Sequence, residues 1–183
     1  MSLNQQLADG IIDNRAGLNL LETGYLRDLD GDFDRYAKNV KETYRRGGNL
    51  DRLRTNFYRR MNKNYGGEFK SLIKQQGDFV TGNLEKGIGG WYKTTKPDAS
   101  ELTALVDKVD ISGDGNLARS INKLSIREKT DASRIIRDGL KKGTATDDIA
   151  SQLAGRTKIS RKNARTVVRT SITRYSALAA DRA

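Results

Sequence analysis

Hydrophobic residues recur at every third or fourth position along much of this chain. The pattern is clearest at residues 24–46, where Tyr25, Leu29, Phe33 and Tyr36 follow one another at such spacings. An α-helix places residues at this spacing on one face, so the pattern predicts an amphipathic helix. A strand would need apolar and polar residues to alternate, and no segment does so convincingly. The sequence therefore predicts an all-α fold.

The same periodicity predicts helices along the rest of the chain, and glycine and polar residues predict where they end. Gly155, for example, follows an apolar periodic segment and is a favourable helix terminator. Residues 87–99 break the pattern and predict a loop or small extended element, with Trp91 and Tyr92 anchoring it to the core. The predicted helices cover residues 2–22, 24–46, 50–64, 68–86, 101–109, 117–125, 126–142, 144–155 and 160 to the end.

Two regions follow from this segmentation. Residues 1–99 are predicted to form an elongated helical arm or hairpin region, and residues 100–183 a small helical domain that ends in a basic amphipathic helix. A length of 183 residues suits one ordinary domain, or a domain with an arm. Only 36% of residues are hydrophobic and 31% are charged, so we expect a modest core and much exposed helix surface.

Several kinds of chemistry are excluded by composition. The chain has no cysteine and no histidine. It therefore cannot form disulfides, thiolate nucleophiles, zinc sites of the common kind or a Ser-His-Asp triad. No apolar run approaches the roughly 18 residues that span a bilayer, and the N-terminus lacks the features of a signal peptide. We expect a protein that is made in a cytoplasm.

Two aspartate-rich segments resemble parts of a calcium-binding EF-hand loop. In residues 28–34 the sixth loop position is Phe33 and the twelfth is Asn39, where glycine and glutamate are needed. In residues 110–115 the twelfth position falls on Ile121. We interpret the first segment as the polar face of a helix and the second as a turn. With no P-loop and no distinctive acid pair either, we expect no metal, no cofactor, no catalytic residues and no small-molecule substrate.

Basic charge is the strongest functional signal. The net charge is +11, which favours a polyanionic partner such as nucleic acid, an anionic membrane surface or an acidic protein. Residues 156–183 hold eight Lys or Arg and one acid. A helical wheel places four of these cations along one flank of an apolar face. This basic stripe, predicted to contact nucleic acid or an acidic protein surface, consists of Lys158, Lys162, Arg165 and Arg169.

A second basic cluster lies at residues 44–63, where arginines alternate with Tyr and Phe. Arg59 and Arg60 are its candidate contact residues, because this composition suits phosphate contact together with stacking. For both clusters the alternative is a solvated helix flank, or arginines that pair with carboxylates of the same chain. Few acids lie near the basic stripe in sequence, which favours an external partner for it.

Residues 139–182 hold a pattern of helices, caps and basic residues. Its first part consists of Leu140, Gly143, Thr146, Ile149, Ala150 and Leu153, and its second part of the motif residues Ala164, Val167, Val168, Arg169 and Thr170. This pattern resembles the Mu F-like, SPP1 gp7-like family of phage minor head (head morphogenesis) proteins, and the resemblance covers roughly residues 117–180. That family's pattern is a helix ending in glycine, a short Ser/Thr-capped helix, a basic linker and a helix with an Arg-Thr pair followed by an acid. Here the acid is replaced by Ser171.

The resemblance implies a non-enzymatic virion component that is made in the host bacterial cytoplasm and associates with the portal or inner capsid. The basic stripe would then contact the portal or face packaged double-stranded DNA without reading its sequence. The protein would be oligomeric in the virion. An alternative within the same lineage is an internal protein ejected into the host with the genome. A cellular nucleic-acid-binding module is a third possibility.

Overall fold

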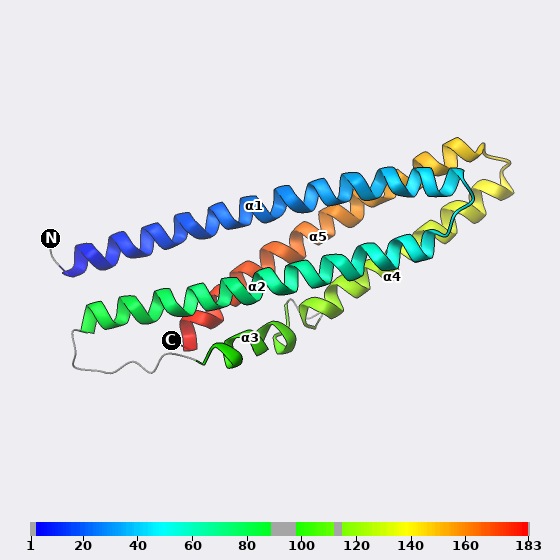
Figure 1. Cartoon of the computed structure of the whole chain (residues 1–183). Coiled ribbons are helices and arrows are strands. Elements are labelled where there is room, and N and C mark those ends of the chain that lie inside the picture. Colours follow the sequence, from blue (N-terminus) through cyan, green and yellow to red (C-terminus); the bar gives the residue numbers. More distant parts are fainter. Residues whose placement is uncertain (1–2, 89–97, 112–114, 183) are drawn as a thin grey trace.

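The computed structural model describes residues 3–88, 98–111 and 115–182. Within these ranges the chain is helical, without a strand, which confirms the predicted all-α fold. Figure 1 shows an elongated bundle of long helices. The helices are α1 (Leu3–Arg45), α2 (Leu50–Ile88), α3 (Ala99–Lys108), α4 (Leu117–Lys141) and α5 (Thr146–Arg182).

Two helical hairpins build the bundle. The first joins α1 to α2 and the second joins α4 to α5, and both connecting turns lie at the same end of the molecule (Figure 1). We call this end the turn end. The short helix α3 lies toward the other end, close to the C-terminus (Figure 1). Helix α5 packs against α1, α2 and α4, so it is the element that the other long helices share.

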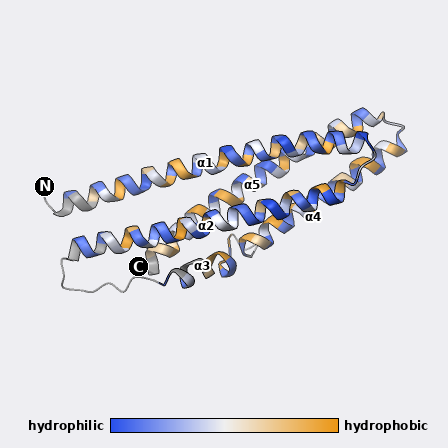
Figure 2. Cartoon of the chain, viewed as in Figure 1, coloured by the Kyte–Doolittle hydropathy of each residue, from blue (hydrophilic) through white to orange (hydrophobic). Residues whose placement is uncertain are grey.

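The core follows directly from the periodic pattern. In α1 the fully buried face includes Leu29 and Phe33, and Tyr36 continues it. The ring of Tyr36 stacks on that of Phe57 from α2, with centroids 4.1 Å apart and an interplanar angle of 7°. Polar residues fill the positions between, and Figure 2 shows hydrophobic and hydrophilic residues interleaved along every long helix. In the described part of the chain no helix is apolar and long enough to cross a membrane.

Helix α5 contributes an unusual buried face, because most of its inward residues are small. Bulky side chains such as Val168 and Tyr175 are also present, but they alternate with shorter ones. Small side chains let neighbouring helix axes approach closely, which brings the flanks of α1 and α5 into contact range. The small buried residues are Ala150, Thr157, Ser160, Ala164, Ser171 and Ala179.

Several predicted helix boundaries are wrong. Helix α1 continues through Gly24, α2 through Gly66 and α5 through Gly155, and the two helices predicted at 117–142 form the single helix α4. A glycine inside a helix costs only about 1 kcal/mol relative to alanine, and packing against neighbouring helices outweighs that cost. Turns form instead where glycine adopts a left-handed conformation, as at Gly143 with φ of 65°.

The predicted arm at 1–99 and the predicted domain at 100–183 share a single hydrophobic core. One buried cluster contains Leu29 and Phe69 from the first region together with Ile121 and Val168 from the second. The two regions therefore pack together as one bundle. The predicted anchors Trp91 and Tyr92 lie outside the described residues, as do positions 112–114 of the second aspartate-rich segment.

Two helical glycines should respond in opposite ways to alanine. A Cβ at Gly155 meets no atom within 4 Å, whereas a Cβ at Gly139 lies 2.6 Å from Cδ1 of the buried Ile149. Gly155→Ala should therefore raise the free energy of unfolding by about 0.5–1 kcal/mol through helix propensity. Gly139→Ala should lower it, because overpacking a core typically costs about 1–3 kcal/mol. Urea unfolding followed by circular dichroism measures both, and a stabilised Gly139→Ala variant would contradict the packing described here.

Candidate nucleic-acid interface

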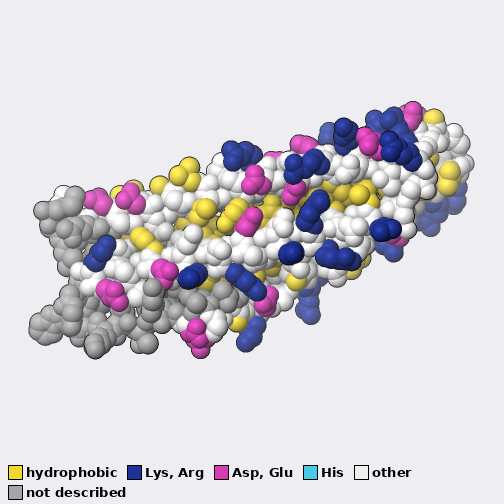
Figure 3. Space-filling view, viewed as in Figure 1, with side chains coloured by type: hydrophobic (Ala, Val, Ile, Leu, Met, Phe, Trp, Pro, Cys, Tyr) yellow, Lys and Arg dark blue, Asp and Glu magenta, His cyan; other side chains and the backbone are white. Residues whose placement is uncertain are grey.

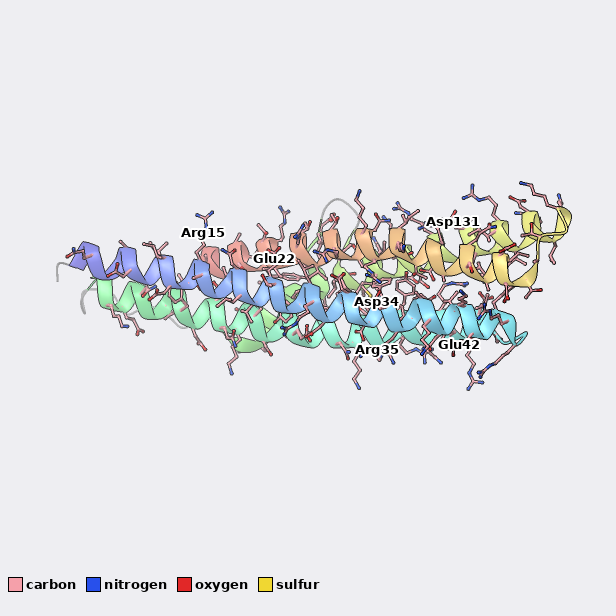
Figure 4. The ribbon with its side chains drawn as sticks, turned by 90° about the horizontal axis from the view of Figure 1, so that it is seen from above. Arg15, Glu22, Asp34, Arg35, Glu42 and Asp131 are labelled. Carbon is pink, nitrogen blue, oxygen red and sulfur yellow. The ribbon has the colours of Figure 1, made fainter. Side chains whose placement is uncertain are left out.

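The arginines of α5 face acidic residues of α1. Arg165 Nη1 donates to Oδ2 of Asp30, and Arg169 Nε donates to Oε1 of Glu22 at 2.9 Å. One turn before Arg165, Arg161 pairs with Asp34. Figure 4 shows Glu22 and Asp34 on the side of α1 that borders α5. These three contacts, the α1–α5 ion pairs, run along an antiparallel helix–helix boundary.

The α1–α5 ion pairs overturn the argument that few acids are available to neutralise the basic stripe. The partners lie 127 to 147 residues away in sequence, so a local count of charges misses them. Arg165 and Arg169 are paired with carboxylates of the same chain. The expectation that the charge of the basic stripe is not neutralised is therefore wrong for these two residues. Lys158 and Lys162 are exposed, and the described residues offer neither of them an ion-pair partner.

The aspartates of the first EF-hand-like segment have a structural role instead. Residues 28–34 lie inside α1 and form no loop. Asp30 and Asp34 are the carboxylates that bind Arg165 and Arg161. Among the described residues, no group of three or more acidic side chains is arranged to hold a metal ion.

A buried polar cluster, which the sequence did not reveal, joins three helices. Glu128 of α4 accepts a hydrogen bond from the hydroxyl of Tyr36 in α1, and at 2.9 Å from that of Tyr58 in α2. The Nε of Arg54 lies 3.9 Å from Glu128 Oε1, and Arg54 also binds Asp51 at 2.5 Å. Glu128 and its three direct partners are at most 6% exposed. No periodicity could predict this cluster, because the hydrogen-bonding tyrosines lie 92 and 70 residues from Glu128.

The Glu128 cluster is built for stability. Burial raises the pKa values of Tyr36 and Tyr58, and the nearby Glu128 carboxylate raises them further. Both hydroxyls are therefore held as neutral donors to the carboxylate. A buried charge is tolerated only with such partners, and removing one partner is strongly destabilising.

Basic charge is concentrated at the turn end. Residues 35–63 contain ten Lys or Arg and two acids, and residues 119–165 contain thirteen Lys or Arg and five acids. Residues 1–34 contain two Lys or Arg and seven acids. Figure 3 shows Lys and Arg side chains gathered over the turn-end half of the visible face. The molecule is thus polarised along its long axis, with most of the excess positive charge in one half.

The second predicted contact pair lies within this basic half. Arg59 and Arg60 are both exposed on α2, and within the described part of the chain neither takes part in an ion pair. Their surroundings differ. Arg59 lines a groove against α4, whereas Arg60 lines none of the grooves described here.

The residues that carry the family resemblance have clear structural positions. Gly143 ends α4 in a left-handed turn, and Thr146 begins α5. Ala164 and Val168 are buried, while Thr170 is half-buried. The remaining motif residues include the buried Ile149, Ala150 and Leu153, the half-buried Val167 and the exposed Leu140.

Ser171 occupies the position where the resembled pattern has an acid. Its side chain is fully buried, and its hydroxyl donates to the carbonyl of Val167 at 2.7 Å. A hydroxyl can form its hydrogen bond within its own helix in this way, whereas a carboxylate at this position would need a donor from outside the helix.

In comparisons with known proteins, no family model, no curated protein and no solved structure matches this chain.

Reversing one charge of an α1–α5 ion pair should destabilise the bundle. Arg165→Asp places two carboxylates together at a site where each side chain is about a third exposed, so we expect a loss of about 1 kcal/mol in the free energy of unfolding. The double variant Arg165→Asp/Asp30→Arg should recover most of that loss. Arg174→Asp controls for helix propensity, because Arg174 is an exposed α5 residue outside the ion pairs described here. Urea unfolding measures all variants, and equal losses for Arg165→Asp and Arg174→Asp would refute the pairing.

Alkaline pH should unfold the chain cooperatively. Burial raises the pKa values of Tyr36, Tyr58, Tyr65 and Tyr175 above the usual value of about 10. Below pH of about 10 these tyrosines are neutral in both states. Above it only the unfolded state ionises, so each should lower the free energy of unfolding by about 1.4 kcal/mol per pH unit. Phenolate absorbance and helical circular dichroism should change together. Full tyrosine ionisation near pH 10 with the helices intact would contradict this.

Proposed function

We propose that this chain is a non-enzymatic phage minor head protein that contacts packaged double-stranded DNA through its turn end. The observation that carries the proposal is the excess of Lys and Arg in residues 35–63 and 119–165. Many of these side chains are exposed, including Arg59, Lys158 and Lys162. The sequence resemblance of residues 139–182 supports the virion assignment.

Phosphate contact suits the surface better than sequence reading does. Exposed Lys and Arg are distributed over several helices, and a set of dispersed cations binds the uniform charge of the DNA backbone. Arg165 and Arg169 hold α5 against α1 in this proposal. Of the predicted contact residues, Lys158, Lys162 and Arg59 are the ones that we assign to DNA, and Arg60 adds only to the general positive charge of the turn end.

The polarity of charge suggests how the bundle would be oriented in a capsid. DNA would attract the turn end and repel the acidic half of α1, where residues 1–34 carry seven acids and two basic residues. The acidic half would then point toward the portal or the inner capsid wall. Several copies around a portal ring would present their turn ends to the same DNA.

DNA binding should be independent of sequence and steeply dependent on salt. We expect the purified chain to bind unrelated duplexes of equal length with the same affinity. If it contacts several phosphates, affinity should fall by at least about tenfold between roughly 50 and 200 mM salt, because bound counterions are released. Fluorescence anisotropy with two unrelated duplexes measures both properties. Binding that does not weaken with salt, or that prefers one duplex, would contradict the proposal.

The virion assignment needs a separate test. Co-expression with the portal protein of the same phage should yield a complex that elutes with the portal ring on size-exclusion chromatography. The portal expressed alone and the chain expressed alone are the controls. Salt-dependent DNA binding without portal association would instead favour a cellular nucleic-acid-binding module.

A further inference from the structure

A groove lined by both polar and apolar side chains runs between α2 and α4 in the basic half of the bundle. Its volume is about 310 Å³. It continues into a second hollow of about 330 Å³ between α2, α3 and the start of α4, because Asn62 and Ala118 line both. From Thr55 to Lys70 the groove follows α2 for about 22 Å at 1.5 Å per residue.

Small residues keep this groove open. Gly66 and Gly67 of α2 border it, and a Cβ at either position would meet no atom within 4 Å. Ala118 offers only a methyl group from the α4 side. On its buried face, the same stretch of α2 carries larger side chains such as Phe57 and Phe69. Small residues on facing helices therefore leave space in the second hollow, where Gly66, Gly67 and Ala118 all form the border.

The lining of the groove is rich in unused hydrogen-bonding groups. Thr55, Asn62, Asn122 and Ser125 line it, and none of these side chains has a hydrogen-bond partner in the described part of the chain. Side-chain hydroxyls and amides that lack protein partners are available to a ligand. Apolar groups line the groove as well, namely Ala118, Ile121, Leu117, Val106 and the ring of Tyr58.

Positive charge borders the groove along α2. Arg59 and Lys63 line it, and neither has an ion-pair partner within the described ranges. The one acid at the border, Asp107, is paired with Lys70 at 3.4 Å. The unpaired charge along the groove is therefore positive, which complements an anionic ligand.

We propose that the α2–α4 groove receives the sugar–phosphate backbone of one nucleic-acid strand, an inference that rests on the proposed function and locates its main contact. Arg59 and Lys63 would neutralise phosphates, and Asn62, Asn122, Thr55 and Ser125 would donate hydrogen bonds to phosphate oxygens. An acidic peptide is the less suitable occupant. Peptide partners anchor through large aromatic or aliphatic side chains in buried pockets. The distinguishing feature of this groove is instead its unpaired positive charge beside free hydroxyls and amides.

Two neighbouring arginines provide the central test. Arg59 lines the groove and Arg60 does not, although both are exposed and unpaired in the described structure. Arg59→Gln should weaken binding to a duplex by about fivefold or more and reduce the salt slope by about 1. Arg60→Gln should change affinity by less than about twofold, as expected for long-range charge alone. Fluorescence anisotropy across a salt series measures both variants.

A second pair of variants tests the shape of the groove at constant charge. Gly66→Leu places a side chain in the second hollow, where a Cβ meets no atom within 4 Å, and it raises helix propensity, so we expect the fold to be retained. We expect it to weaken DNA binding at least about fivefold with an unchanged or higher melting temperature. Gly155→Leu is the matched control, because Gly155 is an open helical glycine in α5 away from the groove. It should leave binding unchanged.

The outcomes separate this inference from the proposed function. Equal losses of DNA affinity for Arg59→Gln and Arg60→Gln, or full binding by Gly66→Leu, would refute the groove as the main DNA contact. DNA binding by the wild-type chain would still support the proposed function. Absence of DNA binding by the wild-type chain would overturn both. Single-stranded and duplex DNA are assayed in parallel to identify which strand form the groove accepts. A poly-glutamate peptide that binds in the groove more tightly than DNA would show an acidic protein partner and refute the inference.

Discussion

The close packing of α5 against its neighbours is the constraint on which the rest of the structure depends. Helix α5 contacts the three other long helices, and much of its buried face consists of small residues such as Thr157, Ser160 and Ala164. A bulky residue at these positions would push α5 away from the helices that surround it. The flanking arginines could then no longer reach Asp30 and Glu22. The close approach of the α1 and α5 backbones is therefore the condition under which these ion pairs can form.

This packing changes which cations are available to a partner. The arginines at the edge of the α5 core face are close enough to α1 for its carboxylates to bind them. Lysines farther from that boundary, such as Lys158 and Lys162, stay exposed. The charged residues that give the net charge of +11 are consequently spread unevenly along the bundle. It accumulates at the turn end, where α1 contributes basic rather than acidic residues.

The sequence predicted the fold class because burial and helical spacing coincide at residues such as Leu29 and Phe33. It failed on helix boundaries, since propensity penalises Gly66 or Gly155 but carries no information about the neighbouring helices that outweigh the penalty. It also failed on Arg165, because its partner is 135 residues away in sequence. Exposure of Arg59 was predictable from its polar position. The groove beside it was not, since a groove exists only once α2 and α4 are placed together.

The buried Glu128 cluster connects the core to that groove. A buried carboxylate without partners costs several kcal/mol, so the bundle is stable only where Tyr36, Tyr58 and Arg54 all reach Glu128. If α2 slid along α4 by one helical turn, the Glu128 carboxylate would lose its partners. The cluster therefore selects one register of α2 against α4. Tyr58 also lines the groove. The same contact that fixes the register of α2 against α4 therefore sets which polar side chains face each other across the groove, and it preorganises that surface before any ligand arrives.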